Sequence, residues 1–237
     1  MDALDALLRQ TPTARRPLLG LTVLVVEDSR FASDAIRLMC LRSGARIRRA
    51  DSLETARRHL AIYRPSVLVV DLGLPDGSGL DLIASLADAI PRIDVILGTS
   101  GDDGMRDQVM DAGADGYFPK PIDSLLAFQT EILRHLPADR QPMTPRLATN
   151  DVINPDPIAY RDDLNHIAQV LAGAKGDQTL DYITQFLGGI ARSAKDHDLD
   201  QAVTKLTLLR HKGRDPKTGV AVLSKLVQDR LSAAGPV

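Results

Sequence analysis

The sequence predicts an α/β fold, a five-stranded parallel sheet wound on both faces by helices, followed by a separate all-α bundle. Over residues 21–136, five predicted strands, three of them apolar runs rich in valine, leucine and isoleucine, alternate with five helical patterns, joined by short loops. The runs are continuously apolar rather than alternating, which indicates strands buried on both faces. After a proline-rich stretch, every periodic segment has helical spacing. These three observations fix the fold class.

Each predicted strand leads into a helix. Ser29 is a suitable N-cap for the first helix, and Gly44 is a suitable stop. The predicted strands are 21–26, 45–49, 67–71, 93–98 and 113–118, and the helices that follow them are 29–44, 52–62, 79–88, 102–111 and 121–135.

Two further segments flank the α/β region. Residues 1–20 form an N-terminal extension, in which Leu4, Leu7 and Leu8 predict a short amphipathic helix before a linker at 12–17. Residues 137–157 carry five prolines and read as an extended linker that contributes nothing to a core. Residues 158–234 then show four apolar stripes, which predict a four-helix bundle.

Composition excludes several classes of protein. The net charge of −2 gives no overall field that would attract nucleic acid or an anionic membrane. The single cysteine, Cys40, lies in an apolar helical stripe, so we expect a buried, reduced thiol. The first residues are acidic where a signal peptide needs basic residues, and no apolar run reaches transmembrane length. A cytoplasmic protein without membrane contact is therefore expected.

Chemically active side chains follow four of the five strands. They are Glu27 and Asp28, Asp71, Thr99 and Lys120. Because parallel strands present their carboxyl ends at one edge, we expect these residues to be neighbours there. Three neighbouring carboxylates favour the binding of a hard divalent cation, for which Mg²⁺ is the obvious candidate. The lysine and the hydroxyl complete a pocket for a tetrahedral anion, which suggests phosphoryl transfer to Asp71.

Four motifs carry a family resemblance. They read Val-Val-Glu27-Asp28-Ser, Val-Val-Asp71-Leu-Gly-Leu-Pro-Asp-Gly-Ser-Gly79, Leu-Gly-Thr99-Ser and Ala-Gly-Ala-Asp-Gly-Tyr117-Phe-Pro-Lys120-Pro. Together, in this order, they resemble the receiver domain of bacterial two-component response regulators, whose sheet is flavodoxin-like. The resemblance covers residues 21 to about 136. No glycine-rich phosphate loop or dinucleotide fingerprint supports a nucleotide-binding alternative.

The resemblance implies a role for each site residue. Asp71 would accept a phosphoryl group from a sensor histidine kinase or a phosphotransfer protein. Asp28 and Asp71 would bind Mg²⁺ directly, Glu27 through water, and Gly73 through its carbonyl. The resemblance implies no enzymatic activity beyond self-catalysed phosphoryl transfer and dephosphorylation.

Other residues would act on the phosphorylated state. The resemblance implies that Lys120 pairs with the phosphoryl oxygens, although a resting salt bridge to Asp71 is the simpler reading. Thr99 would move toward the phosphoryl group, and Tyr117 would rotate into the vacated space. The Lys120–Pro121 bond is a candidate cis peptide. The sequence departs from the family at Glu27, where aspartate is commoner, and in a loop between Thr99 and Lys120 that is about one residue tighter.

No motif in the helical segment, residues 158–234, indicates its function. Its charges balance, and the cluster Arg210, His211, Lys212, Arg214 and Lys217 reads as a solvated turn between helices rather than a phosphate-binding patch. His166 is predicted to be an ordinary surface histidine, since the residues expected after a phosphotransfer histidine are missing. We expect a domain that binds a downstream protein or forms a homodimer, and we do not expect nucleic acid as a partner. The alternatives are a divergent DNA-binding output domain and an enzymatic output of the phosphatase type.

Overall fold

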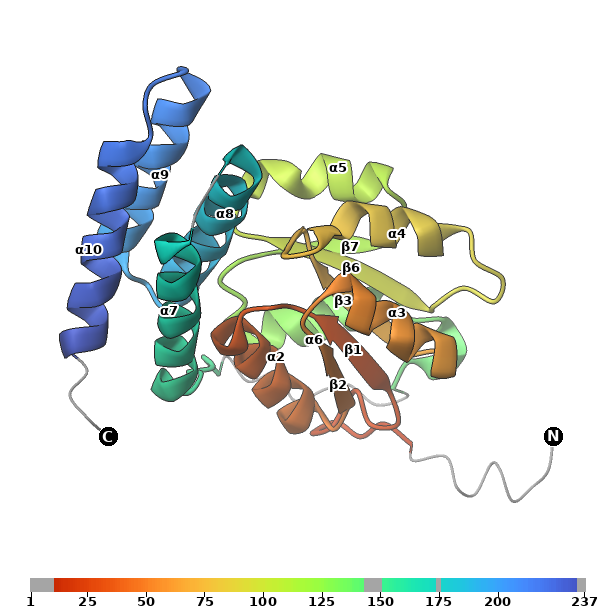
Figure 1. Ribbon diagram of the computed structural model, residues 1–237. Helices are drawn as coiled ribbons and strands as arrows, with labels where there is room; N and C mark the ends of the chain where they lie inside the picture. Colours follow the sequence, from red (N-terminus) through yellow and green to blue (C-terminus); the bar gives the residue numbers. More distant parts are fainter. Residues whose placement is uncertain (1–10, 143–150, 174–175, 234–237) are drawn as a thin grey trace.

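The computed structural model describes residues 11–142, 151–173 and 176–233, and it confirms the predicted fold class. Five parallel strands form one sheet in the order β2-β1-β3-β6-β7 (Figure 1). The strands are β1 (Thr22–Val26), β2 (Arg46–Ala50), β3 (Val67–Asp71), β6 (Val95–Ser100) and β7 (Gly116–Pro119).

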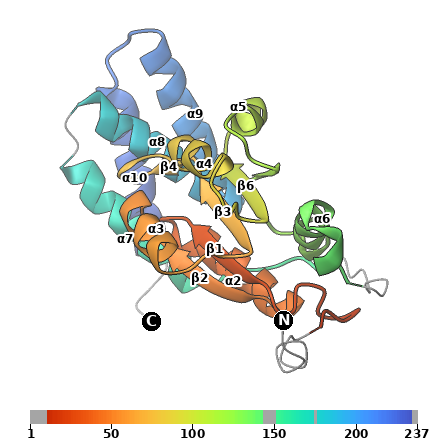
Figure 2. The same cartoon turned by 90° about the vertical axis from the view of Figure 1, so that its right-hand side faces the viewer.

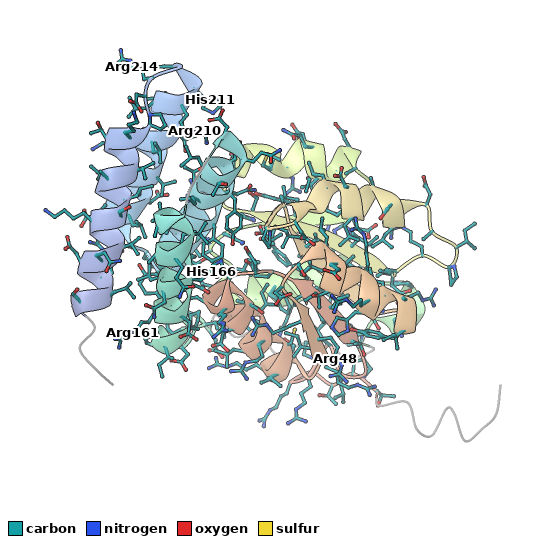
Figure 3. All side chains as sticks on the ribbon, in the orientation of Figure 1. Arg48, Arg161, His166, Arg210, His211 and Arg214 are labelled. Carbon is teal, nitrogen blue, oxygen red and sulfur yellow. The ribbon has the colours of Figure 1, made fainter. Side chains whose placement is uncertain are left out.

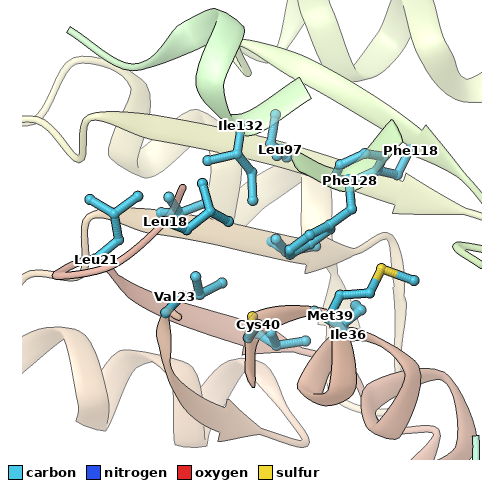
Figure 4. Packing of buried hydrophobic residues seen from close by; sticks show 14 of the residues in the cluster. Leu18, Leu21, Val23, Ile36, Met39, Cys40, Leu97, Phe118, Phe128 and Ile132 are labelled. Atoms are coloured by element: carbon cyan, nitrogen blue, oxygen red, sulfur yellow. The ribbon is translucent and has the colours of Figure 1, made fainter. Parts of the chain in front are cut away.

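Helices cover both faces of the sheet. One face packs against α2 (Arg30–Ser43) and α6 (Leu125–His135), and their apolar side chains form one core with alternate strand residues (Figure 4). The other face packs against α3 (Leu53–Ile62), α4 (Gly79–Ala87) and α5 (Arg106–Asp111). Cys40 lies in the first core as a buried free thiol, as predicted, and burial raises its pKa to about 12.

Local polar contacts set the ends of the helices. The Ser29 hydroxyl accepts a hydrogen bond from the Ala32 amide and begins α2, and Gly44, with a φ of 85°, ends it. The last α/β helix, α6, begins at Leu125 rather than at Pro121 as predicted. Its cap is Ser124, whose hydroxyl accepts from the Ala127 amide. Several short elements of the described residues were not predicted, namely 3₁₀ turns at Asp103–Met105 and Ala138–Arg140 and an antiparallel hairpin of β4 (Gly73–Leu74) and β5 (Gly77–Ser78).

Segments outside the predicted receiver-like region also enter its core. Ile153 is only 2% exposed, and its amide donates to the Asp123 carbonyl. The prediction that residues 137–157 contribute nothing to a core is therefore wrong at Ile153. Leu18, in the N-terminal extension, is fully buried in the same cluster. The helix predicted through Leu4, Leu7 and Leu8 lies outside the described residues.

Four helices follow, and we call them the helical bundle. They are α7 (Pro157–Ala172), α8 (Asp177–Ser193), α9 (His197–His211) and α10 (Lys217–Ala233). The predicted apolar stripes form its core, with Leu164, Ile183 and Leu206 among the fully enclosed side chains. Figures 1 and 2 show α7 and α8 on the side of the α/β region, whereas α9 and α10 lie farther out. Among the described helices, none is long and apolar enough to cross a membrane.

The exposed edge of the sheet is strongly basic. Among the described strands, β2 pairs only with β1, and its Arg46, Arg48 and Arg49 side chains are exposed. Arg48 is labelled in Figure 3. Charged side chains of this kind keep an open edge from pairing with another chain.

Candidate functional site

The sheet register brings the predicted site residues to one edge. Asp71 ends β3 opposite Thr99 of β6, and the Lys120 amide, just past β7, donates to the Ser100 carbonyl over 2.9 Å. Glu27 and Asp28 follow directly after β1, the other neighbour of β3. The five side chains therefore converge where the sequence analysis places them.

Three carboxylates of this edge form a compact acidic cluster. Glu27, Asp28 and Asp71 each present an oxygen, and these atoms lie within 4.8 Å of one another. Glu27 is 1% exposed and Asp71 is 6% exposed. Burial raises the pKa of Glu27 to about 7 and raises that of Asp28 well above its usual range, with a further contribution from the neighbouring carboxylates.

The cluster fits a hard divalent cation. Asp28 Oδ1 is buried and has no hydrogen-bond partner among the described residues. A buried, unpartnered carboxylate oxygen beside two further carboxylates is costly unless a cation or a proton neutralises it. Glu27, Asp28 and Asp71 are thus the residues that would hold the metal.

Lys120 is the counter-charge of the cluster. Its Nζ lies 2.7 Å from Glu27 Oε2 and 3.2 Å from Asp71 Oδ1, and its side chain is almost completely buried. Burial alone would lower the pKa of Lys120, but the carboxylates of Asp71 and Glu27 outweigh it and raise the pKa. The salt bridge to Asp71 considered in the sequence analysis is present, together with a shorter one to Glu27.

The two predicted switch residues, Thr99 and Tyr117, differ in their hydrogen bonding. Thr99 Oγ1 is buried and has no hydrogen-bond partner among the described residues, so its hydroxyl is available to another group. Tyr117 is buried on the face of α3, α4 and α5, and its hydroxyl donates to the carbonyls of Asp102 over 2.8 Å and Ser100 over 3.3 Å. The Lys120–Pro121 peptide bond is cis.

Sequence reasoning missed the residues that the helical bundle brings to this edge. The Tyr182 hydroxyl, on α8, donates to Asp28 Oδ2 over 2.9 Å. Asp163, on α7, accepts from the Ser29 hydroxyl and from the amides of Arg30 and Phe31. One signal was in the sequence, since Tyr182, Phe186 and Gly189 share helical spacing and mark a second interacting face of α8.

Two other predicted features lie away from the acidic cluster. His166 is exposed on α7, but its Nε2 lies 3.2 Å from the Tyr182 hydroxyl, so it is linked to the boundary between bundle and sheet (Figure 3). Arg210 lies in the last turn of α9, at the far end of the bundle, where it forms an ion pair with Asp181 (Figure 3). The predicted position of the basic cluster at an interhelical turn is confirmed.

Comparison with known proteins identifies the α/β region. Residues 23–128 match the family model described as the response regulator receiver domain. The chain is 33% identical over 102 residues to the KDP operon transcriptional regulatory protein KdpE of Escherichia coli, a match that covers 42% of this chain and 44% of that protein. It is 32% identical over 116 residues to the virulence transcriptional regulatory protein PhoP of Salmonella typhimurium, covering 47% and 51%.

Solved receiver-domain structures are also similar to about half of the chain. A response regulator receiver domain from Methylobacillus flagellatus is 25% identical, with a TM-score of 0.43, and covers 47% of this chain and 98% of that one. The chain spans about half the length of the curated relatives it matches. The matched residues end at 128, before the helical bundle begins.

Proposed function

Residues 23–128 are a response regulator receiver domain, and from this premise we propose that the chain is a two-component response regulator phosphorylated on Asp71. A sensor histidine kinase or a phosphotransfer protein would be the donor. One observation carries the proposal: Asp71 lies among two further carboxylates, a buried lysine and an unpartnered threonine hydroxyl. This set can bind a divalent cation and a tetrahedral anion side by side.

The transfer follows from this arrangement. An Asp71 carboxylate oxygen attacks the phosphorus in line; the new O–P bond forms as the P–N bond to the donor imidazole breaks, and the imidazole leaves and takes up a proton. Asp28 and Asp71, with Glu27 through water and the Gly73 carbonyl, would hold Mg²⁺, which would supply charge neutralisation for the transferring group. Lys120 pairs with the phosphoryl oxygens, and Thr99 donates its hydroxyl to them.

Phosphorylation would then change the region around Thr99 and Tyr117. The phosphoryl group adds up to about two negative charges and three acceptor oxygens beside the Thr99 hydroxyl. Thr99 turns toward these oxygens, and Tyr117 leaves its bonds to the loop carbonyls and moves into the space. These two residues make up the proposed switch.

The helical bundle would transmit the signal by protein contacts, either with a downstream partner or in a homodimer. A second candidate is transcriptional control, which the names of the curated relatives favour. The two are separated by what the bundle binds when Asp71 is phosphorylated.

The acceptor role is tested by incubating the full chain with a small acyl phosphate and Mg²⁺. Mass spectrometry should find one phosphoryl group on wild type and none on Asp71→Asn, whose amide cannot attack phosphorus. Omission of Mg²⁺ should lower the rate at least tenfold. Phosphorylation of Asp71→Asn at the rate of wild type would refute the assignment. Affinity capture with phosphorylated wild type, against Asp71→Asn, then distinguishes a protein partner from DNA.

A further inference from the structure

The acceptor carboxylate is covered by the helical bundle. Asp71 lines a narrow cavity of about 10 Å³, whose far wall is made by α8 through Gln185, Phe186, Gly189 and Ile190. Together with Tyr182, we call these residues the α8 lid. A cavity of this size holds at most one water molecule. A transferring phosphoryl group carries three oxygens, each about as large as water, so it cannot enter while the α8 lid is in place.

One open groove adjoins the region. An open groove of about 640 Å³ runs between α8 and the β4–β5 hairpin, and it is lined by Gly73, Tyr182 and Gln185. Asp71 does not line this groove. A donor that follows the groove therefore meets the α8 lid before it meets the acceptor.

The α8 lid also forms a hydrogen bond with one of the carboxylates that would bind the metal. The Tyr182 hydroxyl donates to Asp28 Oδ2 over 2.9 Å, and Asp28 is one of the three carboxylates of the cation site. The backbone of α8 lies close to the rest of the pocket, since a Cβ built on Gly189 would be 3.7 Å from Lys120 Nζ. Consecutive glycines destabilise the interior of a helix. At Gly189 an added Cβ would make only ordinary van der Waals contact with Lys120, so a small side chain fits at this position.

A second set of contacts holds the bundle in this position. Asp163 of α7 is 2% exposed and accepts three hydrogen bonds at the start of α2, from the Ser29 hydroxyl and the Arg30 and Phe31 amides, over 2.7 to 3.0 Å. Its carboxylate thereby lies at the positive end of the α2 dipole. The Asp162–Arg30 ion pair and the edge contact between Phe31 and Tyr160 flank it.

We propose that the helical bundle is an intramolecular lid on the phosphoacceptor, and that phosphorylation and lid closure exclude each other. This inference rests on the proposed phosphorylation of Asp71. The closed form excludes the donor, and phosphorylation takes place only after α8 has lifted from Asp71. The phosphoryl group then fills the space against which α8 had packed, so the lid cannot close again. The faces of α7 and α8 that had been buried are thereby exposed in the phosphorylated protein.

A reversible crosslink tests the lid directly. A Cβ built on Gly101 would lie 3.4 Å from Gly189 Cα and 2.7 Å from the flexible end of Arg192, so the two backbones are close enough for cysteines at these positions to be crosslinked once Arg192 shifts. The Gly101→Cys/Gly189→Cys double variant can therefore be locked closed by oxidation, and the buried Cys40 thiol stays out of the exchange. With a small acyl phosphate and Mg²⁺, the oxidised protein should be phosphorylated at least tenfold more slowly than the same sample after reduction.

The outcomes distinguish a failure of the lid proposal from a failure of the assignment of Asp71 as the phosphoacceptor. Each single-cysteine variant should show no change on oxidation or reduction, which would tie the effect to the disulfide. Equal phosphorylation of the oxidised and reduced double variant would overturn the lid. Failure of both wild type and the reduced variant to accept phosphate would instead overturn the proposed function, and the lid with it.

Discussion

At the scale of single residues, the acidic cluster couples metal binding to protons. Burial raises the pKa of Glu27 to about 7 and that of Asp28 well above its usual range, so both carboxyls bind protons at a pH where exposed carboxyls do not. A cation must displace these protons before it can bind. The affinity of the site for Mg²⁺ should therefore depend on pH near neutrality.

We expect the Mg²⁺ affinity to rise as the pH rises. With a pKa of about 7, Glu27 alone predicts a gain of about tenfold between pH 6 and pH 8, measured by calorimetric titration of the full chain. Glu27→Gln, which cannot bind that proton, should show a weaker pH dependence. An affinity that stays constant across this range in wild type would contradict the prediction.

At the scale of elements, one polar cluster ties three helices of the bundle together. Asp196 caps α9 by accepting from the Leu199 amide, and it also accepts from the Tyr160 hydroxyl of α7. Arg230 of α10 donates two hydrogen bonds to the same carboxylate, over 2.8 and 2.9 Å. The bonds from Arg230 lower the pKa of Asp196, so the stabilisation is present above the usual aspartate pKa and is lost as the pH falls through the lowered value.

Removing this carboxylate should destabilise the bundle. Asp196→Ala deletes a helix cap and leaves Arg230 with only its exposed contact to Asp198, so we expect the free energy of unfolding to fall by about 2 to 3 kcal/mol at neutral pH. Urea unfolding of the full chain, followed by circular dichroism, measures the change. The matched control is Asp198→Ala, whose side chain is 80% exposed and lies 3.4 Å from the same arginine. It should change stability by less than about 0.5 kcal/mol, and equal effects would refute this role of Asp196.

At the scale of the whole molecule, the boundary between bundle and sheet decides whether Asp71 can be reached. The two neighbouring aspartates of α7 contribute unequally to it. Asp163 is buried and accepts three hydrogen bonds from the start of α2, whereas Asp162 forms a solvent-exposed ion pair with Arg30. Losing a buried charged acceptor costs several times more than losing an exposed ion pair.

The two aspartates therefore provide a matched pair of variants. Asp163→Asn should favour the open form and raise the rate of phosphorylation by a small acyl phosphate by about tenfold or more, since a lost charged acceptor costs about 1.5 to 3 kcal/mol. Asp162→Asn should change the rate by less than about threefold. Hydrogen exchange at the Arg30 and Phe31 amides gives a second measurement, because both should lose protection in Asp163→Asn. Unchanged exchange and an unchanged rate would show that Asp163 does not hold the lid closed.

The sequence by itself determined the α/β fold, the five strands of its parallel sheet in their order along the chain, and the five residues at the sheet edge. It could do so because these features depend on local periodicity and on the rule that parallel strands end at one edge. Glu27, Asp28, Asp71, Thr99 and Lys120 each follow a recognisable apolar strand. The apolar stripes of the bundle were equally visible, since each lies within one helix.

Only the tertiary structure decided what faces Asp71. The contacts of Tyr182 with Asp28 and of Asp163 with Ser29 join residues more than 130 positions apart. From sequence alone, a polar residue on a helix is predicted to be solvent-exposed. Its tertiary hydrogen-bond partner cannot be inferred from the local sequence pattern. Ile153 was misread for the same reason, because a single apolar residue among prolines has no periodicity that would reveal its burial. The position of the bundle is set by long-range packing, and the accessibility of Asp71 depends on it.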